Sequence, residues 1–225
     1  NKMKKFSKLV IVFLSISVFL VSCKESTDKK QKTNTTVENK KPEITTVSVL
    51  NANLATESDL MTLGLSSEVV AKLLEARPFV TMNDFNETME GVNTEELFKK
   101  LFVPFNLNTT AEKDFKMIPG VGDKMAHEFE EYRPYTSILQ FKREIGKYVD
   151  KNEVSRYLDY VFVPIELNSS TEDDIKALPG VGDRMSHEFI EYRPYKNLVQ
   201  FRKEIGKYVD ENELKRLERF VYLKE

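Results

Sequence analysis

An internal repeat constrains the fold of this chain more than any other feature. Residues 106–165 align without gaps with residues 166–225, at an offset of 60, and about half of the positions are identical. Residues 50–105 form a third, less similar copy. Self-similarity at such a period is typical of one supersecondary unit repeated in tandem. The body of the chain is therefore predicted to contain three consecutive copies of one small fold.

Three short segments mark the copies. In the middle copy they are Leu107-Asn108, Pro119–Asp123 and Tyr132–Tyr135, and each recurs 60 residues later. The eroded copy has weaker equivalents, which we expect at Leu50-Asn51, Leu63-Gly64-Leu65 and Arg77-Pro78-Phe79. The order of these segments is the same in all three copies, so each copy is expected to repeat the same set of elements.

The apolar spacing within each copy predicts helices. In the last copy Met185, Phe189 and Tyr192 fall at i, i+4 and i+7, and Pro194 stops that helix because the residue before a proline avoids the helical region. Two further helices follow, with apolar stripes at Leu198, Phe201 and Ile205, and at Leu214, Leu217 and Val221. No strand pattern interrupts the copies. The predicted fold is all-α, with four or five short helices in each unit.

The first 22 residues have the composition of a signal peptide. Lys4, Lys5 and Lys8 precede an apolar run, Leu9–Val21, that is short for a membrane-spanning helix. Ser22-Cys23 follows this run and resembles the bacterial lipobox, in which cleavage before the cysteine is followed by its lipidation. The resemblance implies that Cys23 carries lipid and anchors the protein to a membrane, outside the cytoplasm, in the cell envelope. An uncleaved anchor with an incidental cysteine is the alternative.

Residues 23–49 are rich in Lys, Thr, Asn and Glu and contain no glycine or aromatic residue. Such a segment buries too little apolar surface to fold, so it is predicted to be a disordered tether. The domain organisation that follows is a signal peptide over 1–22, the tether over 23–49, a degenerate unit over 50–105, and two well-preserved units over 106–165 and 166–225.

The order helix, Pro-Gly-Val-Gly, helix resembles the helix-hairpin-helix motif. The complete unit, from Leu-Asn to Tyr-Arg-Pro-Tyr, is similar to that of the ComEA-type competence DNA receptors over residues 50–225, closely in two copies and poorly in the first. The resemblance implies binding of double-stranded DNA without sequence preference, and a role in DNA capture or uptake.

The chemistry of the Pro-Gly-Val-Gly segment also points to a phosphate site. Glycine accepts a positive φ that other residues resist, so Gly120 and Gly122 are expected to turn successive N–H groups outward at a helix start, where the dipole favours an anion. Val121 is expected to plug the hairpin into the core, Asp123 to cap the helix, and Lys124 to add a charge. The predicted phosphate-binding residues are Gly120, Val121, Gly122, Asp123 and Lys124 and their equivalents Gly180, Val181, Gly182, Asp183 and Arg184.

The charge distribution leaves a second reading open. Residues 51–225 carry 24 basic and 32 acidic residues, a net charge of -8, which differs from the basic surface of most nucleic-acid-binding proteins. Gly-Val-Gly is also a common way to make a tight turn between helices. The alternative is a cell-envelope scaffold that contacts protein partners and has kept the fold without binding DNA. The first copy, with four basic and nine acidic residues over 51–105, is expected to be a spacer or protein-contact module.

Basic residues cluster at a second, weaker hairpin in each well-preserved unit. They either extend a phosphate track or form a solvated helix face, and they are Lys142, Arg143, Lys147, Arg202, Lys203 and Lys207. Enzymatic chemistry is not expected, and neither is a cofactor or a metal. The only histidines, His127 and His187, can each approach a glutamate one helical turn later, Glu131 or Glu191, whereas a catalytic zinc needs three protein ligands.

Overall fold

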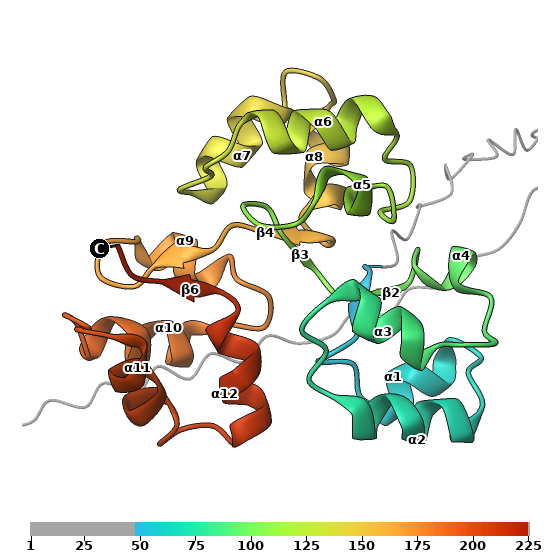
Figure 1. The fold of residues 1–225 in the computed structure, drawn as a ribbon, viewed down its shortest axis with the longest axis horizontal. Coiled ribbons are helices and arrows are strands. Elements are labelled where there is room, and N and C mark those ends of the chain that lie inside the picture. The colour runs from blue at the N-terminus through green and yellow to red at the C-terminus, as the bar shows by residue number, and fades with distance from the viewer. Residues whose placement is uncertain (1–47, 225) are drawn as a thin grey trace, which may run out of the picture. The chain divides into compact units, whose positions relative to one another are not determined.

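The computed structural model describes residues 48–224. The expected signal peptide, Cys23 and nearly all of the expected tether lie outside this range. The described part is mainly helical, as expected, and its helices fall into three groups of four that follow one another along the chain (Figure 1). None of the helices in residues 48–224 has the length and apolar character needed to cross a membrane.

Each group of four helices occupies one repeat. The first contains α1 (Glu57–Thr62), α2 (Ser67–Ala76), α3 (Met82–Thr88) and α4 (Thr94–Leu97). The second contains α5 (Glu112–Phe115), α6 (Asp123–Glu131), α7 (Ile138–Ile145) and α8 (Lys151–Tyr157). The third contains α9 (Glu172–Lys176), α10 (Asp183–Glu191), α11 (Leu198–Ile205) and α12 (Glu211–Glu218).

Short parallel strand pairs, which the sequence did not predict, close each repeat. They join β1 (Leu50–Asn51) to β2 (Leu101–Phe102), β3 (Phe105–Asn106) to β4 (Val161–Phe162), and β5 (Ile165–Glu166) to β6 (Val221–Tyr222). Parallel pairing requires a long crossover connection, which the four helices supply. The pairing places Phe105 in the second repeat and Ile165 in the third, one residue before the expected unit boundaries.

Phenylalanines form the core of each repeat. The ring of Phe129 lies 5.2 Å from that of Phe115, 5.8 Å from that of Phe141 and 5.2 Å from that of Tyr157, measured between centroids. Phe189 and Phe201 in the third repeat are fully buried, as their helical spacing predicted, and so are their equivalents in the second repeat, Phe129 and Phe141. Burying one such side chain contributes roughly 1.5–3 kcal/mol, so these rings account for much of the stability of each unit.

Two of the three recurring segments, Leu-Asn and Tyr-Arg-Pro-Tyr, are hydrogen-bonded to each other. The Asn108 side chain donates to the Tyr135 carbonyl (2.8 Å) and accepts from the Tyr135 N–H (2.7 Å). The Arg133 guanidinium donates to the carbonyls of Leu107 and Thr110. Leu-Asn and Tyr-Arg-Pro-Tyr therefore recur together because one segment satisfies the backbone groups of the other.

The same contact corrects the alignment of the first repeat. There Asn53, and not Asn51, exchanges hydrogen bonds with the Phe79 backbone, at 3.0 and 2.7 Å. Ala52-Asn53 is therefore the equivalent of Leu107-Asn108, and the expected match at Leu50-Asn51 was wrong. Leu50–Asn51 forms β1, which corresponds to β3 in the second repeat.

Aromatic contacts also join neighbouring repeats. The ring of Phe102, at the end of the first repeat, lies 5.2 Å from Phe105 and 5.0 Å from Tyr160 of the second. The Ile138 N–H in the second repeat donates to the Asp174 carboxylate in the third (3.1 Å). Neighbouring repeats therefore pack against each other and also form a hydrogen bond between them.

Candidate nucleic-acid interface

The Pro-Gly-Val-Gly segments form hairpins between α5 and α6 and between α9 and α10. Gly120 has φ 82° and Gly180 has φ 72°, a conformation that L side chains rarely adopt. Val121 and Val181 are buried, at 6% and 5% exposure, and plug the hairpins into the cores as expected. The backbone on either side of each valine is therefore turned toward the surface.

The second glycine of each pair plays a different role from the one expected. Gly122 has φ -96° and Gly182 has φ -93°, so neither takes a positive φ. Each is instead the N-cap residue of the next helix. Asp123 and Asp183 were expected to be N-caps, but each occupies the first helical position and makes no capping hydrogen bond.

Glycine N-caps set α6 and α10 apart from the other helices in the described range. Only α5, which begins after Ala111, also lacks a side-chain capping hydrogen bond. The other nine helices have one, from Thr56, Ser66, Thr81, Asn93, Ser137, Asp150, Thr171, Asn197 and Asp210. A polar side chain at the N-cap normally satisfies the first free N–H groups of a helix. The hairpin helices therefore begin with N–H groups that no side chain satisfies.

The N–H groups of Gly122, Asp123 and Lys124 have no protein acceptor among residues 48–224, and the same holds at the third-repeat positions Gly182 to Arg184. All of these residues are exposed. The amides are therefore neither turned into the core nor occupied by a neighbouring group. A helix start with this geometry favours an anion.

The carboxylates beside these amides are paired with lysines. Lys116 Nζ lies 2.8 Å from the Asp123 carboxylate, and Lys176 Nζ lies 2.9 Å from the Asp183 carboxylate. The hydrogen bond and charge of each lysine lower the pKa of the aspartate, which therefore stays ionised. The paired lysine offsets the carboxylate's repulsion of a phosphate, although these exposed pairs contribute little stability.

An arginine that the sequence analysis missed contacts the third hairpin. Arg216 is buried, donates from Nη1 to the Pro179 carbonyl (2.6 Å) and forms two 2.6 Å bonds to the Glu213 carboxylate. A Cβ at residue 180 would lie 3.2 Å from Arg216 Nη2. The positive φ of Gly180 favours glycine, and an added Cβ would also require Arg216 to shift by a few tenths of an ångström. The sequence Glu-x-x-Arg, which occurs at Glu213–Arg216 and recurs at Glu153–Arg156, could have identified this arginine.

The first repeat has the same positive-φ glycine at its hairpin, but a polar side chain caps the helix that follows. Gly64 has φ 80°, and Ser66 is the N-cap of α2, where its hydroxyl accepts from the Val69 N–H (3.3 Å). Counted from the N-cap, Glu68 stands where the other hairpins have Lys124 and Arg184. The first repeat therefore keeps the positive-φ glycine, but it has a serine in place of the glycine N-cap and a glutamate in place of the basic residue.

The third hairpin is more crowded than the second. The Leu54 side chain of the first repeat lies so close to Gly180 that a Cβ there would meet it at 2.4 Å. At Gly120 the nearest atom to such a Cβ is Arg156 Nη2, at 3.4 Å. The first repeat thus contacts the third hairpin at Gly180. At Gly120 in the second hairpin, no residue of another repeat in the described range lies within 4 Å of such a Cβ.

Most of the secondary basic residues are engaged in ion pairs. Arg143 and Lys147 both contact Glu144, Lys207 contacts Glu204, and Arg202 contacts Glu218. Lys142 and Lys203 are exposed and make no ion pair within residues 48–224. The helices that follow, α8 and α12, are capped by Asp150 and Asp210, so the helix starts at this second hairpin are closed.

The histidines do not form a metal site with the residues around them. His127 Nδ1 lies 3.3 Å from the Glu112 carboxylate, which raises the pKa of His127, and His187 Nε2 lies 3.6 Å from Glu191. No group of three His, Cys, Asp or Glu side chains in the described range is arranged to hold a metal ion.

Comparison with known proteins finds no family model, no curated protein and no solved structure that matches the chain.

Proposed function

We propose that the protein binds double-stranded DNA without sequence preference, through the hairpins of the second and third repeats. The observation that carries this proposal is that α6 and α10 begin at glycines, with exposed N–H groups and no side-chain cap. These amides hydrogen-bond to backbone phosphates, and Lys124 and Arg184 add charge-assisted contacts. Such contacts carry no sequence information, which accounts for the lack of preference.

The first repeat acts in this proposal as a spacer or protein-contact module. Ser66 caps its helix start through the Val69 N–H, and Glu68 reverses the charge beside the first amides of α2. Two open hairpins in one chain bind one duplex together and gain affinity from their linkage. The similarity of the repeats to ComEA-type receptors supports DNA capture or uptake as the process that this binding serves.

The proposal places this binding in the cell envelope, with the protein held to a membrane by lipid on Cys23. Metabolic labelling with radioactive palmitate is expected to mark the wild-type protein and to leave a Cys23→Ala variant unlabelled. Several acyl chains on one cysteine give stable anchoring, so the variant is also expected to leave the membrane fraction. An unlabelled wild-type protein would contradict lipidation.

Salt dependence tests the DNA proposal. Full-length protein in detergent should bind a labelled duplex, with an affinity that falls linearly on a log–log plot against salt concentration. Replacing Lys124 and Arg184 by glutamine should lower affinity about tenfold at low salt and reduce the slope by about two, because two phosphate contacts are lost. Fluorescence anisotropy measures both quantities.

A matched control neutralises two exposed lysines of the first repeat, Lys72 and Lys100, by the same substitution. This variant has the same net charge and should retain the wild-type slope. The acidic body, with its net charge of -8 over residues 51–225, favours the envelope-scaffold alternative. Absence of wild-type binding at low salt would contradict the DNA proposal and leave the scaffold alternative in its place.

A further inference from the structure

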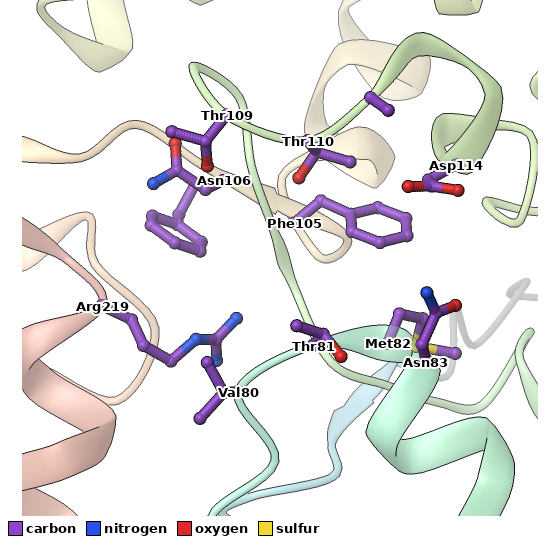
Figure 2. Close-up of a pocket in the computed structure, with 12 residues that line it drawn as sticks. Val80, Thr81, Met82, Asn83, Phe105, Asn106, Thr109, Thr110, Asp114 and Arg219 are labelled. Carbon is purple, nitrogen blue, oxygen red and sulfur yellow. The ribbon is translucent and has the colours of Figure 1, made fainter.

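A crevice of about 460 Å³ opens where residues of the three repeats meet, away from the hairpins (Figure 2). The first repeat contributes Thr81, the second Phe105 and Asp114, and the third Arg219. Small-molecule sites have volumes of roughly 300–1,000 Å³ and combine apolar walls with a few polar groups, and this crevice does both.

Arg219 supplies a positive charge that makes no ion pair in the described residues, although the Asp84 carboxylate lies near enough to raise its pKa. Its Nη1 donates to the Phe79 carbonyl (3.3 Å) and its Nη2 donates to the Pro104 carbonyl (3.1 Å), so it holds the first and second repeats to the third. These bonds use two of the five N–H donors of a guanidinium. No ion pair to Arg219 is present among residues 48–224. Burial and the nearby Arg216 lower its pKa to about 10, so the group remains charged at neutral pH.

Asp114 supplies a negative charge to the same crevice. Figure 2 shows its carboxylate on the side opposite Arg219, with Phe105 between them along the upper wall. In the described part of the chain this carboxylate accepts no hydrogen bond and makes no ion pair, and it does not pair with Arg219. Two opposite charges therefore face one cavity without neutralising each other.

We propose that this crevice binds a short zwitterionic peptide, with its C-terminal carboxylate on Arg219 and its N-terminal ammonium group on Asp114. A guanidinium recognises a carboxylate by charge-assisted hydrogen bonds, and an isolated carboxylate recognises an ammonium group in the same way. Thr81, Thr110 and Phe105 also line the crevice, and Phe162 lies against the Arg219 guanidinium, whose carbon is 5.7 Å from the ring centroid. A polyanion is disfavoured because Asp114 repels it. The proposal is independent of DNA binding at the hairpins.

Calorimetry with the dipeptide alanylalanine tests this proposal on the full-length protein in detergent. The dipeptide should bind at least about tenfold more tightly than its N-acetylated form or its C-terminal amide, because each blocked form loses one charge-assisted contact. Asp114→Asn should weaken the dipeptide about tenfold and leave the N-acetylated form unchanged. Asp173→Asn, an exposed change of equal charge on α9, should alter neither affinity.

Arg219→Gln should abolish preference for the free carboxylate, and thermal unfolding establishes whether that variant folds. The Asp114→Asn result does not depend on whether the Arg219→Gln variant folds. Asp114 makes no side-chain bond that supports the fold. Equal affinity for the three peptides would overturn the proposal. So would absence of dipeptide binding in the millimolar range, or tighter binding of inorganic phosphate than of the dipeptide.

Discussion

Replacing both Gly122 and Gly182 by aspartate is expected to lower DNA affinity about a hundredfold without destabilising the protein. Both glycines have extended N-cap backbone, with ψ near 180°, and a Cβ at either position meets no atom within 4 Å. The new carboxylate should accept from the first amides of the helix, as Asp150 does from the N–H groups of Asn152 and Glu153 at 2.9 Å. Each hairpin then loses a phosphate contact worth roughly 1.5 kcal/mol.

The expected gain in stability distinguishes this result from simple unfolding. Aspartate is preferred over glycine at an N-cap by a few tenths of a kcal/mol, so the double variant should unfold at an equal or slightly higher temperature. Gly122→Ser with Gly182→Ser copies the cap of Ser66 without adding charge and should weaken binding less. Unchanged DNA affinity in the aspartate variant would show that these amides do not contact phosphate. Fluorescence anisotropy and thermal unfolding provide the two measurements.

Replacing Arg216 by methionine is expected to destabilise the protein by about 3 kcal/mol. The Arg216 side chain is only 2% exposed, and its removal leaves the Glu213 carboxylate without its cation and the Pro179 carbonyl without its donor. Breaking a buried pair by removing one partner costs roughly 3–5 kcal/mol, and the partial exposure of Glu213 places this case at the lower end. Urea unfolding of the full-length protein measures the change.

Arg156→Met is the matched control for that substitution. Arg156 makes the equivalent pair with Glu153, but its side chain is 31% exposed, so water replaces part of the lost interaction. We expect a loss of about 1 kcal/mol there. Equal losses at the two positions, or a loss below about 1 kcal/mol at Arg216, would contradict the supporting role assigned to the buried arginine beneath the third hairpin.

The helical part of the fold could be predicted because its signals are local. The i, i+4, i+7 spacing around Phe189 spans a single helix, and Pro179-Gly180 marks its boundary within a few residues. The strand pairs could not be predicted in this way. Each strand has two residues, whereas alternation becomes visible only over roughly four to eight. Their pairing also joins residues about one repeat apart.

The candidate site shows the same limit. The glycine pairs and buried valines were evident from Pro-Gly-Val-Gly, but composition does not tell which glycine takes the positive φ and which becomes the N-cap. Asp183 was assigned to the cap because aspartate is a preferred capping residue, yet the hairpin places Gly182 there. Arg216 was missed because its contact with Pro179 spans 37 residues. Asn53 was missed because it follows Ala52, whereas Leu50-Asn51 repeats the Leu-Asn pair of the other copies.

The acidic surface and the proposed DNA binding are compatible because the charges nearest the hairpins are paired. Asp123 and Asp183 are each held by a lysine, and Lys124 and Arg184 are exposed beside the open amides. Repulsion between the acidic body and DNA should still weaken binding at low salt, because the Debye length is longer there and distant charges are screened less. The affinity is therefore expected to depend on local geometry more than on net charge.

Amide chemical shifts measured by NMR during titration with duplex DNA test the central claim most directly. The largest shifts are expected at the N–H groups of residues 122–124 and 182–184, with little change at the serine-capped helix start around Ser66, and they should disappear in the double aspartate variant. Shifts confined to other surfaces, or equal shifts at all three hairpins, would contradict a phosphate site built from glycine-capped helix starts.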